Sequence, residues 1–232
     1  MSFFELQNIR KSYGRAGIDR QSVLKGIGFT IARSEALGLI GPSGSGKSTI
    51  ARIALGMERP DSGQVRFMGK PISYSGNRAK RAHYSRVQMI WQDPKVYLNP
   101  FLPIRTIIME PMAAFGMGKE KERIRKADHL MEILGLPKSS ARLKAGQLSG
   151  GQCQRVAIAR ALSVSPKLLI CDEALVSLDL PQQVNIIKIL MTLQREMALS
   201  LLFISHDIKT VSRLCQRILY LDQGKIKKCN LV

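Results

Sequence analysis

The sequence predicts an α/β fold with a mainly parallel sheet flanked by helices. Short apolar runs of strand length alternate with amphipathic stretches of helical length, which is typical of a parallel sheet covered on both faces. The apolar run Leu37–Ile40, bounded by glycine, is followed by a glycine-rich turn and a helix expected at Lys47–Leu55. An antiparallel β part is expected at the N-terminus, and a helical subdomain is expected as an insertion at about residues 93–163.

The individual elements follow from local patterns. Phe3–Ile9 and Phe29–Ile31 are expected to be strands, separated by a loop that contains glycine and arginine. Turn residues at Pro60–Gly63 precede a strand at Val87–Trp91, and several prolines break up the segment that follows. Lys119–Leu134 carries apolar residues at steps of three and four, which predicts an amphipathic helix. The later elements expected are helix Arg155–Leu162, strand Leu168–Cys171, helix Gln182–Met197, strand Leu201–Ser205, helix Ile208–Cys215 and strand Ile218–Leu221.

Length and composition favour a single cytosolic domain. The 232 residues, of which 45% are hydrophobic, fit one large domain covering residues 1–232. No stretch approaches the ~18 continuous apolar residues that a membrane span needs, and the first residues lack the pattern of a secretory signal. Because the four cysteines show neither a C-x-x-C pair nor a disulfide-like spacing, reduced thiols are expected.

The formal charge of +19 makes nucleic acid the first partner to consider. However, the basic residues are scattered in small clusters, and no aromatic-basic RNA motif or zinc-finger spacing accompanies them. Anionic lipid or nucleotide phosphates would suit this charge equally well. We therefore expect no nucleic-acid partner.

The clearest motif matches the phosphate-binding pattern G-x-x-x-x-G-K-[ST] between a buried strand and a helix start. Consecutive amides in such a loop form an anion cradle with the helix N-terminus behind them. Lys47 is expected to reach the β- and γ-phosphates of ATP, and Ser48 to bind Mg²⁺. The alternative, a glycine-rich turn without a ligand, is disfavoured by this context. The nine residues expected to bind ATP are Gly41, Pro42, Ser43, Gly44, Ser45, Gly46, Lys47, Ser48 and Thr49.

Two further motifs carry charge or anion-binding potential. The apolar strand Leu168–Cys171 ends in Asp172, suited to hold Mg²⁺ opposite Ser48, and in Glu173, suited to polarise the attacking water. An acidic loop after a buried strand is the alternative. Leu148 precedes a serine and two glycines that open a helix, which makes a second anion-binding helix N-terminus or a simple helix cap. The four residues of this second site are Ser149, Gly150, Gly151 and Gln152.

Together, the phosphate loop, the acidic strand and the pentapeptide Leu148–Gln152 resemble the ATP-binding-cassette (ABC) ATPases, over essentially the whole chain. The resemblance implies a P-loop nucleotide-hydrolase fold and ATP·Mg²⁺ hydrolysis in a dimer that drives a membrane transporter. It implies that Ser149–Gln152 caps the ATP of the partner subunit.

The resemblance also assigns single residues. Tyr13 corresponds to the aromatic residue that stacks on adenine, Gln92 to the glutamine that senses the γ-phosphate and contacts the metal, and His206 to the histidine at the γ-phosphate. Asp179, in Ser177-Leu178-Asp179, corresponds to the partner-contacting aspartate. The remaining histidines, His83 and His129, match nothing and are expected on the surface.

Three positions depart from the usual family pattern. Cys153 follows the pentapeptide Leu148–Gln152, which resembles the signature of the family, at a position where glutamine or arginine is commoner. Ala174 replaces the proline that usually follows the catalytic glutamate, here Glu173, and residues 175–177 are atypical. None of these positions is a phosphate, metal or water ligand. The departures could therefore change the turnover rate, but they do not change the reaction that the resemblance implies.

Within the family, Trp91–Pro94 followed by Leu98–Pro100 resembles the peptide and nickel importer branch, and Cys171–Ala174 leans toward nickel or metal–chelator import. This branch implies permease subunits, a second and different ABC ATPase subunit, and an extracytoplasmic solute-binding protein. The subunit would then lie on the cytoplasmic side of the inner membrane, bound through the permease. An export or lipid-handling ATPase, and a non-transport member acting on DNA or ribosomes, are the alternatives.

The segment from Gln92 to Phe101 is expected to meet the permease. It leaves the sheet through prolines, which limit its conformations and could pass on a shift at Gln92. Its apolar residues are expected to form a socket for a short permease helix, with packing onto the helical insertion as the alternative. These residues are Val96, Tyr97, Leu98 and Phe101.

Overall fold

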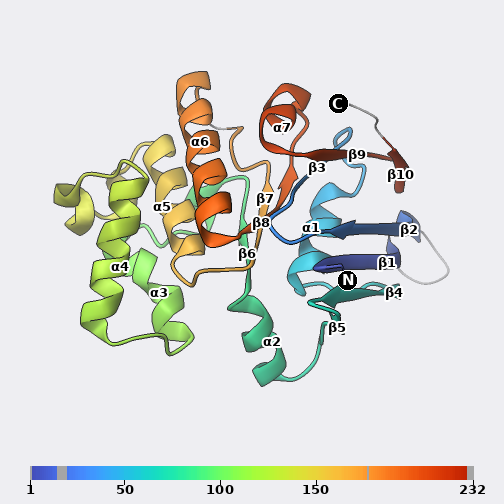
Figure 1. Ribbon diagram of the computed structural model, residues 1–232, viewed down its shortest axis with the longest axis horizontal. Coiled ribbons are helices and arrows are strands. Elements are labelled where there is room, and N and C mark those ends of the chain that lie inside the picture. The colour runs from blue at the N-terminus through green and yellow to red at the C-terminus, as the bar shows by residue number, and fades with distance from the viewer. Residues whose placement is uncertain (1, 15–19, 177, 229–232) are drawn as a thin grey trace.

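The computed structural model describes residues 2–14, 20–176 and 178–228, and a six-stranded sheet lies at its centre (Figure 1). The strand order is β10-β9-β3-β8-β7-β6. All neighbouring pairs in this order are parallel except β10 and β9. The mainly parallel sheet expected from the sequence is therefore confirmed. Its strands are β3 (Ala36–Ile40), β6 (Val87–Ile90), β7 (Leu168–Asp172), β8 (Ser200–Ile204), β9 (Arg217–Asp222) and β10 (Lys225–Lys228).

The N-terminal sheet is antiparallel, with strand order β2-β1-β4-β5. The loop expected between Ile9 and Phe29 is wrong, because β1 continues to Tyr13 and β2 begins at Gln21. Side chains near that end of the strand pair are mostly polar and only partly buried, so the residue pattern did not distinguish it from a loop. The strands are β1 (Phe4–Tyr13), β2 (Gln21–Ile31), β4 (Ser62–Phe67) and β5 (Lys70–Pro71).

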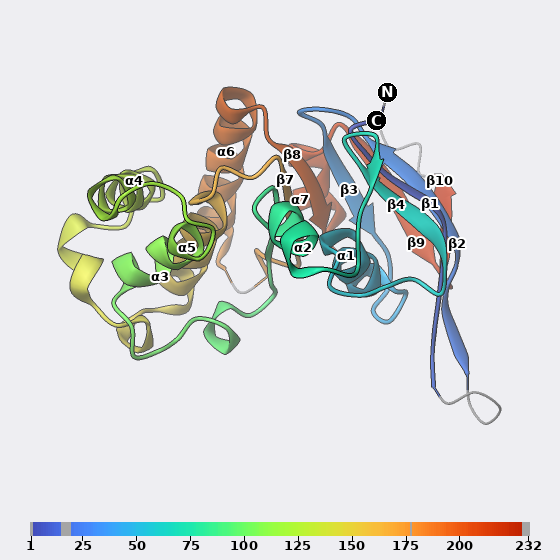
Figure 2. The same ribbon diagram turned by 90° about the horizontal axis from the view of Figure 1, so that it is seen from below.

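Helix α1 (Lys47–Leu55) lies between the two sheets (Figure 2). Its apolar side chains Ile50 and Ile53 are fully buried in one core cluster with residues from β1 and β3. A second cluster joins the opposite face of the central sheet to α5, α6 and α7. The phosphate loop is thus held between β3, whose side chains enter both clusters, and α1, whose side chains enter the first.

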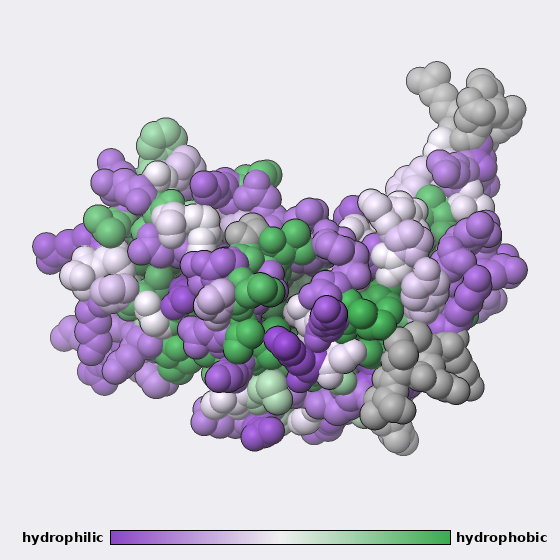
Figure 3. All heavy atoms as spheres, turned by 90° about the horizontal axis from the view of Figure 1, so that it is seen from above, coloured by the Kyte–Doolittle hydropathy of each residue, from purple (hydrophilic) through white to green (hydrophobic). Residues whose placement is uncertain are grey.

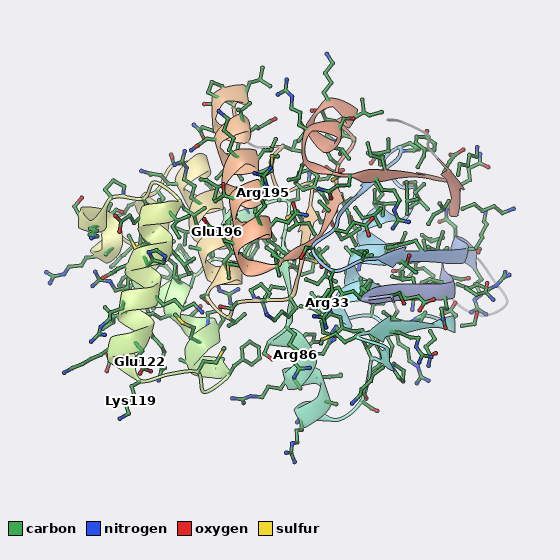
Figure 4. All side chains as sticks on the ribbon, viewed as in Figure 1. Arg33, Arg86, Lys119, Glu122, Arg195 and Glu196 are labelled. Atoms are coloured by element: carbon green, nitrogen blue, oxygen red, sulfur yellow. The ribbon has the colours of Figure 1, made fainter. Side chains whose placement is uncertain are left out.

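The helical elements between β6 and β7 form a lobe at the left of Figure 1. The prolines are expected to break up this segment, but Pro111 lies inside helix α3, which continues through it although proline lacks a backbone donor and is unfavourable in a helix interior. The start of α4 is capped by Glu122, whose carboxylate accepts the Lys119 amide at 2.7 Å (Figure 4). The elements are η1 (Pro94–Val96), α3 (Ile104–Ala114), α4 (Glu120–Ile133), η2 (Lys138–Arg142), η3 (Ala145–Gln147) and α5 (Gly150–Leu162).

Backbone hydrogen bonds tie the two ends of this helical lobe together. The Ile104 amide donates to the Leu143 carbonyl at 3.0 Å, and the Gly146 amide donates to the Pro100 carbonyl at 3.1 Å. An isolated antiparallel bridge pairs Pro103 with Lys144. We call these contacts the neck of the lobe. The segment that follows Gln92 is therefore bonded directly to the segment that leads into Ser149.

Three helices complete the described chain: α2 (Asn77–Tyr84), α6 (Leu180–Met197) and α7 (Ile208–Leu214). The surface position expected for His83 is wrong, because this side chain is buried against α1 and lies edge-on to Phe67. His129 is exposed, as expected. Within the described residues, no helix is both long enough and apolar enough to cross a membrane.

Candidate active site

The phosphate loop turns sharply between β3 and α1. A Cβ on Gly41 would lie 2.1 Å from the Leu221 carbonyl oxygen, so this position accepts only glycine without movement. Gly44, with φ +76°, has no heavy atom within 4 Å of the place a Cβ would take. The first turn of α1 contains no acidic residue. The loop therefore keeps an open, electropositive helix start in which an anion would be stabilised.

Lys47 is held inside this loop. Its side chain is buried, and its Nζ donates to the carbonyl oxygens of Gly41 and Pro42, both at 2.9 Å. An ammonium group satisfied by the loop's own carbonyls can exchange these for phosphate oxygens without further desolvation. The expected role of Lys47 fits this geometry.

Asp172 ends β7 beside Ser48, which follows Lys47 in α1. The Ser48 hydroxyl lies near enough to the Asp172 carboxyl to lower its pKa, and the Oδ1 atom of this carboxyl is buried without a partner among the described residues. Burial raises the pKa of Asp172 above its usual value of 3.8, against the opposing effect of the Ser48 contact. A hydroxyl and an unpartnered buried carboxylate oxygen are ligands that Mg²⁺ prefers, so these two residues fit the expected metal.

Glu173 and His206 face each other across the ends of β7 and β8. The Glu173 Oε1 atom lies 3.7 Å from the His206 Nδ1 atom, and the histidine is the more exposed of the two. Glu173 has φ 49°, a left-handed conformation that is uncommon for a residue with a side chain. Its amide donates to the Ile204 carbonyl at 2.9 Å, which holds this turn in place. Strained backbone of this kind is often concentrated at catalytic positions.

Strand register brings Gln92 to the same edge of the sheet. Ile90 pairs with Cys171, so Gln92 and Glu173 each lie two residues beyond a matched pair of parallel strands. The strand itself ends at Ile90, one residue earlier than predicted. Because the carboxyl ends of parallel strands meet at one edge, Gln92 belongs with the phosphate loop, Glu173 and His206. Gln92 is exposed there.

The second anion site opens helix α5. Ser149 caps this helix by accepting the Gln152 amide at 3.3 Å, and the Gln152 side chain accepts the Ser149 amide at 3.0 Å. A Cβ on Gly150 would meet nothing within 4 Å, whereas one on Gly151 would lie 2.2 Å from Oε1 of Gln182. Figures 1 and 2 place α5 and α1 on opposite sides of β7 and β8. The structure therefore does not bring the two anion sites of one chain together.

Asp179 has a local role in this chain. It caps α6, with its carboxylate accepting the amide of Gln182 at 2.8 Å and the side-chain amide of the same residue at 2.9 Å. Gln182, bonded to Asp179, therefore also lies close beside Gly151 of the expected second anion site. Ser177, in the same motif, lies outside the described residues.

Tyr13 ends β1 near α1, with 39% of its surface exposed. Its hydroxyl donates to Glu58 at 2.5 Å and lies 3.3 Å from the Thr49 hydroxyl. The tyrosine is therefore placed beside the last residue of the phosphate loop.

The family described as "ABC transporter" matches residues 24–176, a range that contains the phosphate loop, the signature at Ser149 and the acidic strand. The chain belongs to the ABC transporter family. It is an ATP-binding and ATP-hydrolysing cassette subunit of a transporter.

Relatives and solved structures agree with this membership. Nickel import ATP-binding protein NikE of Escherichia coli (strain K12) is 38% identical over 237 aligned positions, covering 100% of this chain and 88% of NikE. A putative peptide import ATP-binding protein of Brucella abortus (strain 2308) is 44% identical over 204 positions, covering 86% of this chain and 60% of that protein. The dimeric bacterial ABC transporter cassette MJ0796 matches with TM-score 0.88 and 29% identity over 97% of both chains. The expected resemblance to the nickel and peptide importer branch is confirmed.

The segment after Gln92 differs from the expected socket in this cassette. Leu98 is only 4% exposed and packs with Tyr97 into the core shared with α5. The prediction that these two residues line a socket for a permease helix is therefore wrong. Val96 and Phe101, by contrast, are 82% and 76% exposed. Figure 3, which shows the molecule from above, has apolar surface near the middle of that face and polar surface around it.

The departures from the family pattern fit their surroundings. Cys153 is buried, and Ala174 is buried in the turn after Glu173. Sequence reasoning missed Glu58 and Lys11, which surround Tyr13, and Gln182, which lies beside both Asp179 and Gly151. Lys11 and Gln182 are close in sequence to Tyr13 and Asp179, but the motifs do not show that Glu58 meets Tyr13 and Lys11, or that Gln182 lies beside Gly151, because these segments are distant in the sequence.

Proposed function

We propose that the cassette, a single nucleotide-binding domain with a helical subdomain at about residues 93–163, hydrolyses ATP in a composite site. ATP on the phosphate loop would be capped by the signature of a second cassette. The separation of α1 from α5 within one chain supports this proposal, because it leaves the N-terminus of α5 without an anion of its own. Open space at Gly150 is the observation that carries it, since a phosphate can approach the backbone there.

The chemistry follows from the groups at the sheet edge. As the oxygen of a water molecule bonds to the γ-phosphorus, Glu173 would take one of its protons, and the bond from this phosphorus to the β–γ bridging oxygen breaks to give ADP and phosphate. Lys47, the loop amides and His206 would stabilise charge on the transferred group. Gln92, at the same edge, would position water and report the presence of the γ-phosphate.

Ser48, Asp172 and Gln92 would hold Mg²⁺. The bound ion supplies charge neutralisation on the β- and γ-phosphates. The unpartnered Oδ1 atom of Asp172 supports this assignment. In the closed dimer, Asp179 would turn its exposed cap toward the second subunit.

Substituting Gly150 tests the composite site. Gly150→Asp adds a carboxylate at the first turn of α5, where the helix dipole favours negative charge and no neighbouring atom is displaced. The chain should fold and bind ATP with unchanged affinity, whereas phosphate release by the assembled complex should collapse. Ser139→Asp, an exposed position of the same lobe, is the matched control. Weakened ATP binding by the isolated variant would contradict a site shared between subunits.

The transporter is proposed to be an importer of nickel, a metal–chelator complex or peptides. The names of the relatives from Escherichia coli and Brucella abortus support this substrate class. In such a complex the cassette would pair with a second, different cassette and bind permease subunits from the cytoplasmic side of the membrane. An extracytoplasmic binding protein would deliver solute to the permease. Uptake of radiolabelled nickel, with and without chelator, and of a short peptide by the reconstituted complex would decide among these solutes.

Val96 and Phe101 are proposed to contact the permease. Both are large apolar side chains left exposed on a segment in which Leu98 is buried and Tyr97 is partly buried. The neck would couple this contact to the signature, since the same segment is hydrogen-bonded to the residues before Ser149.

A further inference from the structure

The Tyr13 side chain is held by a network that joins three segments of the chain. Its hydroxyl donates to Glu58 Oε1 at 2.5 Å, and Arg52 Nη2 donates to the hydroxyl at 3.3 Å. Arg52 Nε in turn donates to the second Glu58 oxygen at 3.0 Å. The Thr49 hydroxyl, at the end of the phosphate loop, lies 3.3 Å from that of Tyr13. The end of β1, the start of α1 and the turn after α1 are thereby fixed relative to one another.

Lys11 fixes the plane of the ring. Its Nζ lies over one face of the Tyr13 ring, 5.5 Å from the centroid. The same Nζ atom is bound to Glu58 at 3.2 Å and to the Arg59 carbonyl at 2.9 Å. Glu58 therefore acts on the Tyr13 side chain in two ways, directly through the Tyr13 hydroxyl and indirectly through Lys11, which lies against the ring. With Lys11 on one face, a stacked base would lie on the other.

We infer that Glu58 is a positioning residue that, through Lys11 and the Tyr13 hydroxyl, holds the Tyr13 ring to receive the purine base of the nucleotide. The inference rests on the proposed assignment of Tyr13 to base stacking. A ring fixed before binding does not lose side-chain freedom when the base arrives, so affinity gains from the preorganisation. The Thr49 contact sets the distance from the base site to the phosphate cradle, which the covalent structure of ATP requires to be constant.

The charge state of Glu58 is consistent with this role. Partial burial raises its pKa, but hydrogen bonds from Tyr13, Arg52 and Lys11 outweigh it and lower the pKa below the usual 4.5. The carboxylate is ionised at neutral pH and accepts all three donors together.

Comparing ATP with inorganic triphosphate separates the base site from the cradle, because triphosphate has no base to stack. Binding of both ligands to the full-length chain, measured by calorimetry, should show ATP weakened about three- to tenfold in Glu58→Ala. Triphosphate affinity should stay unchanged, which also shows that the variant is folded. Glu35→Ala, which removes a glutamate of similar exposure paired with Arg217, should leave both affinities unchanged.

Tyr13→Ala completes the test. The double variant Glu58→Ala/Tyr13→Ala should bind ATP no more weakly than Tyr13→Ala alone, because Glu58 acts on the base only through the Tyr13 ring. Equal losses for ATP and triphosphate in Glu58→Ala would overturn the inference, since Glu58 would then support the cradle itself. If Tyr13→Ala weakens ATP binding and Glu58→Ala does not, the positioning role alone fails. If Tyr13→Ala has no effect, the base-stacking assignment fails with it.

Discussion

Phe101 and Leu98 lie three residues apart in the proposed docking segment but should respond to mutation in opposite ways. Phe101 is 76% exposed, so Phe101→Asp should change the free energy of unfolding by less than about 0.5 kcal/mol. Leu98 is 4% exposed, and Leu98→Ala should cost about 2–5 kcal/mol. In a chain of this length that corresponds to a fall in Tm of roughly 4–20 °C.

Two measurements distinguish docking from folding. Thermal unfolding of the purified chain should leave Phe101→Asp near wild type and lower the Tm of Leu98→Ala. Copurification with the permease subunits, and solute uptake by the reconstituted complex, should fall in Phe101→Asp while ATP affinity stays constant. Met68→Asp, an exposed apolar residue on the β4–β5 turn, is the control. Normal uptake by Phe101→Asp, or equal loss in Met68→Asp, would refute a docking role for this segment.

Four further outcomes are expected. Glu173→Gln should bind ATP but release phosphate about 10²–10⁴-fold more slowly, and near-normal turnover at saturating ATP would remove Glu173 as the general base. Lys47→Ala should instead weaken nucleotide binding, as measured by calorimetry. Burial lowers the pKa of His83 below 6.5, so the unfolded state binds more protons and the free energy of unfolding should fall as pH drops below 6.5. Urea unfolding at several pH values should show this fall, and His83→Phe should weaken the pH dependence. The isolated chain should be mostly monomeric and a poor ATPase, and both properties should change when the cognate cassette and permease are added.

The sequence predicted the central sheet and most of its strands because buried parallel strands leave short, almost continuous apolar runs. Leu37–Ile40 and Leu168–Cys171 are of this kind, and both are fully buried in β3 and β7. The polar ends of β1 and β2 leave no such signal, since they are stabilised by pairing and not by burial. Pro111 led to the opposite error, because it predicts a break where the structure has a helix. Packing of α3 against α4 and α5 outweighs the backbone donor lost at this proline.

In the site, the sequence predicted the residues that belong to motifs, but it did not predict the residues that hold them in place. Lys47, Asp172 and Glu173 stand at fixed offsets within continuous motifs, so their spacing indicates chemistry directly. Glu58 and Gln182 act through side chains that meet only after folding. His83 illustrates the same limit, because only the turn of α2 against α1 places it in the interior.

The neck at Pro103 and Lys144 also determines where the chain can accept inserted residues. Because the bridge closes the helical lobe at its base, residues 105–142 form a loop whose ends are already held together. Lengthening such a loop adds only about 0.6 kcal/mol of closure entropy for each doubling of its length. Insertions between α3 and α4 should therefore be tolerated without displacing Gln92 or Ser149. Related proteins could therefore gain or lose residues in the lobe while the distance between Gln92 and Ser149 stays constant.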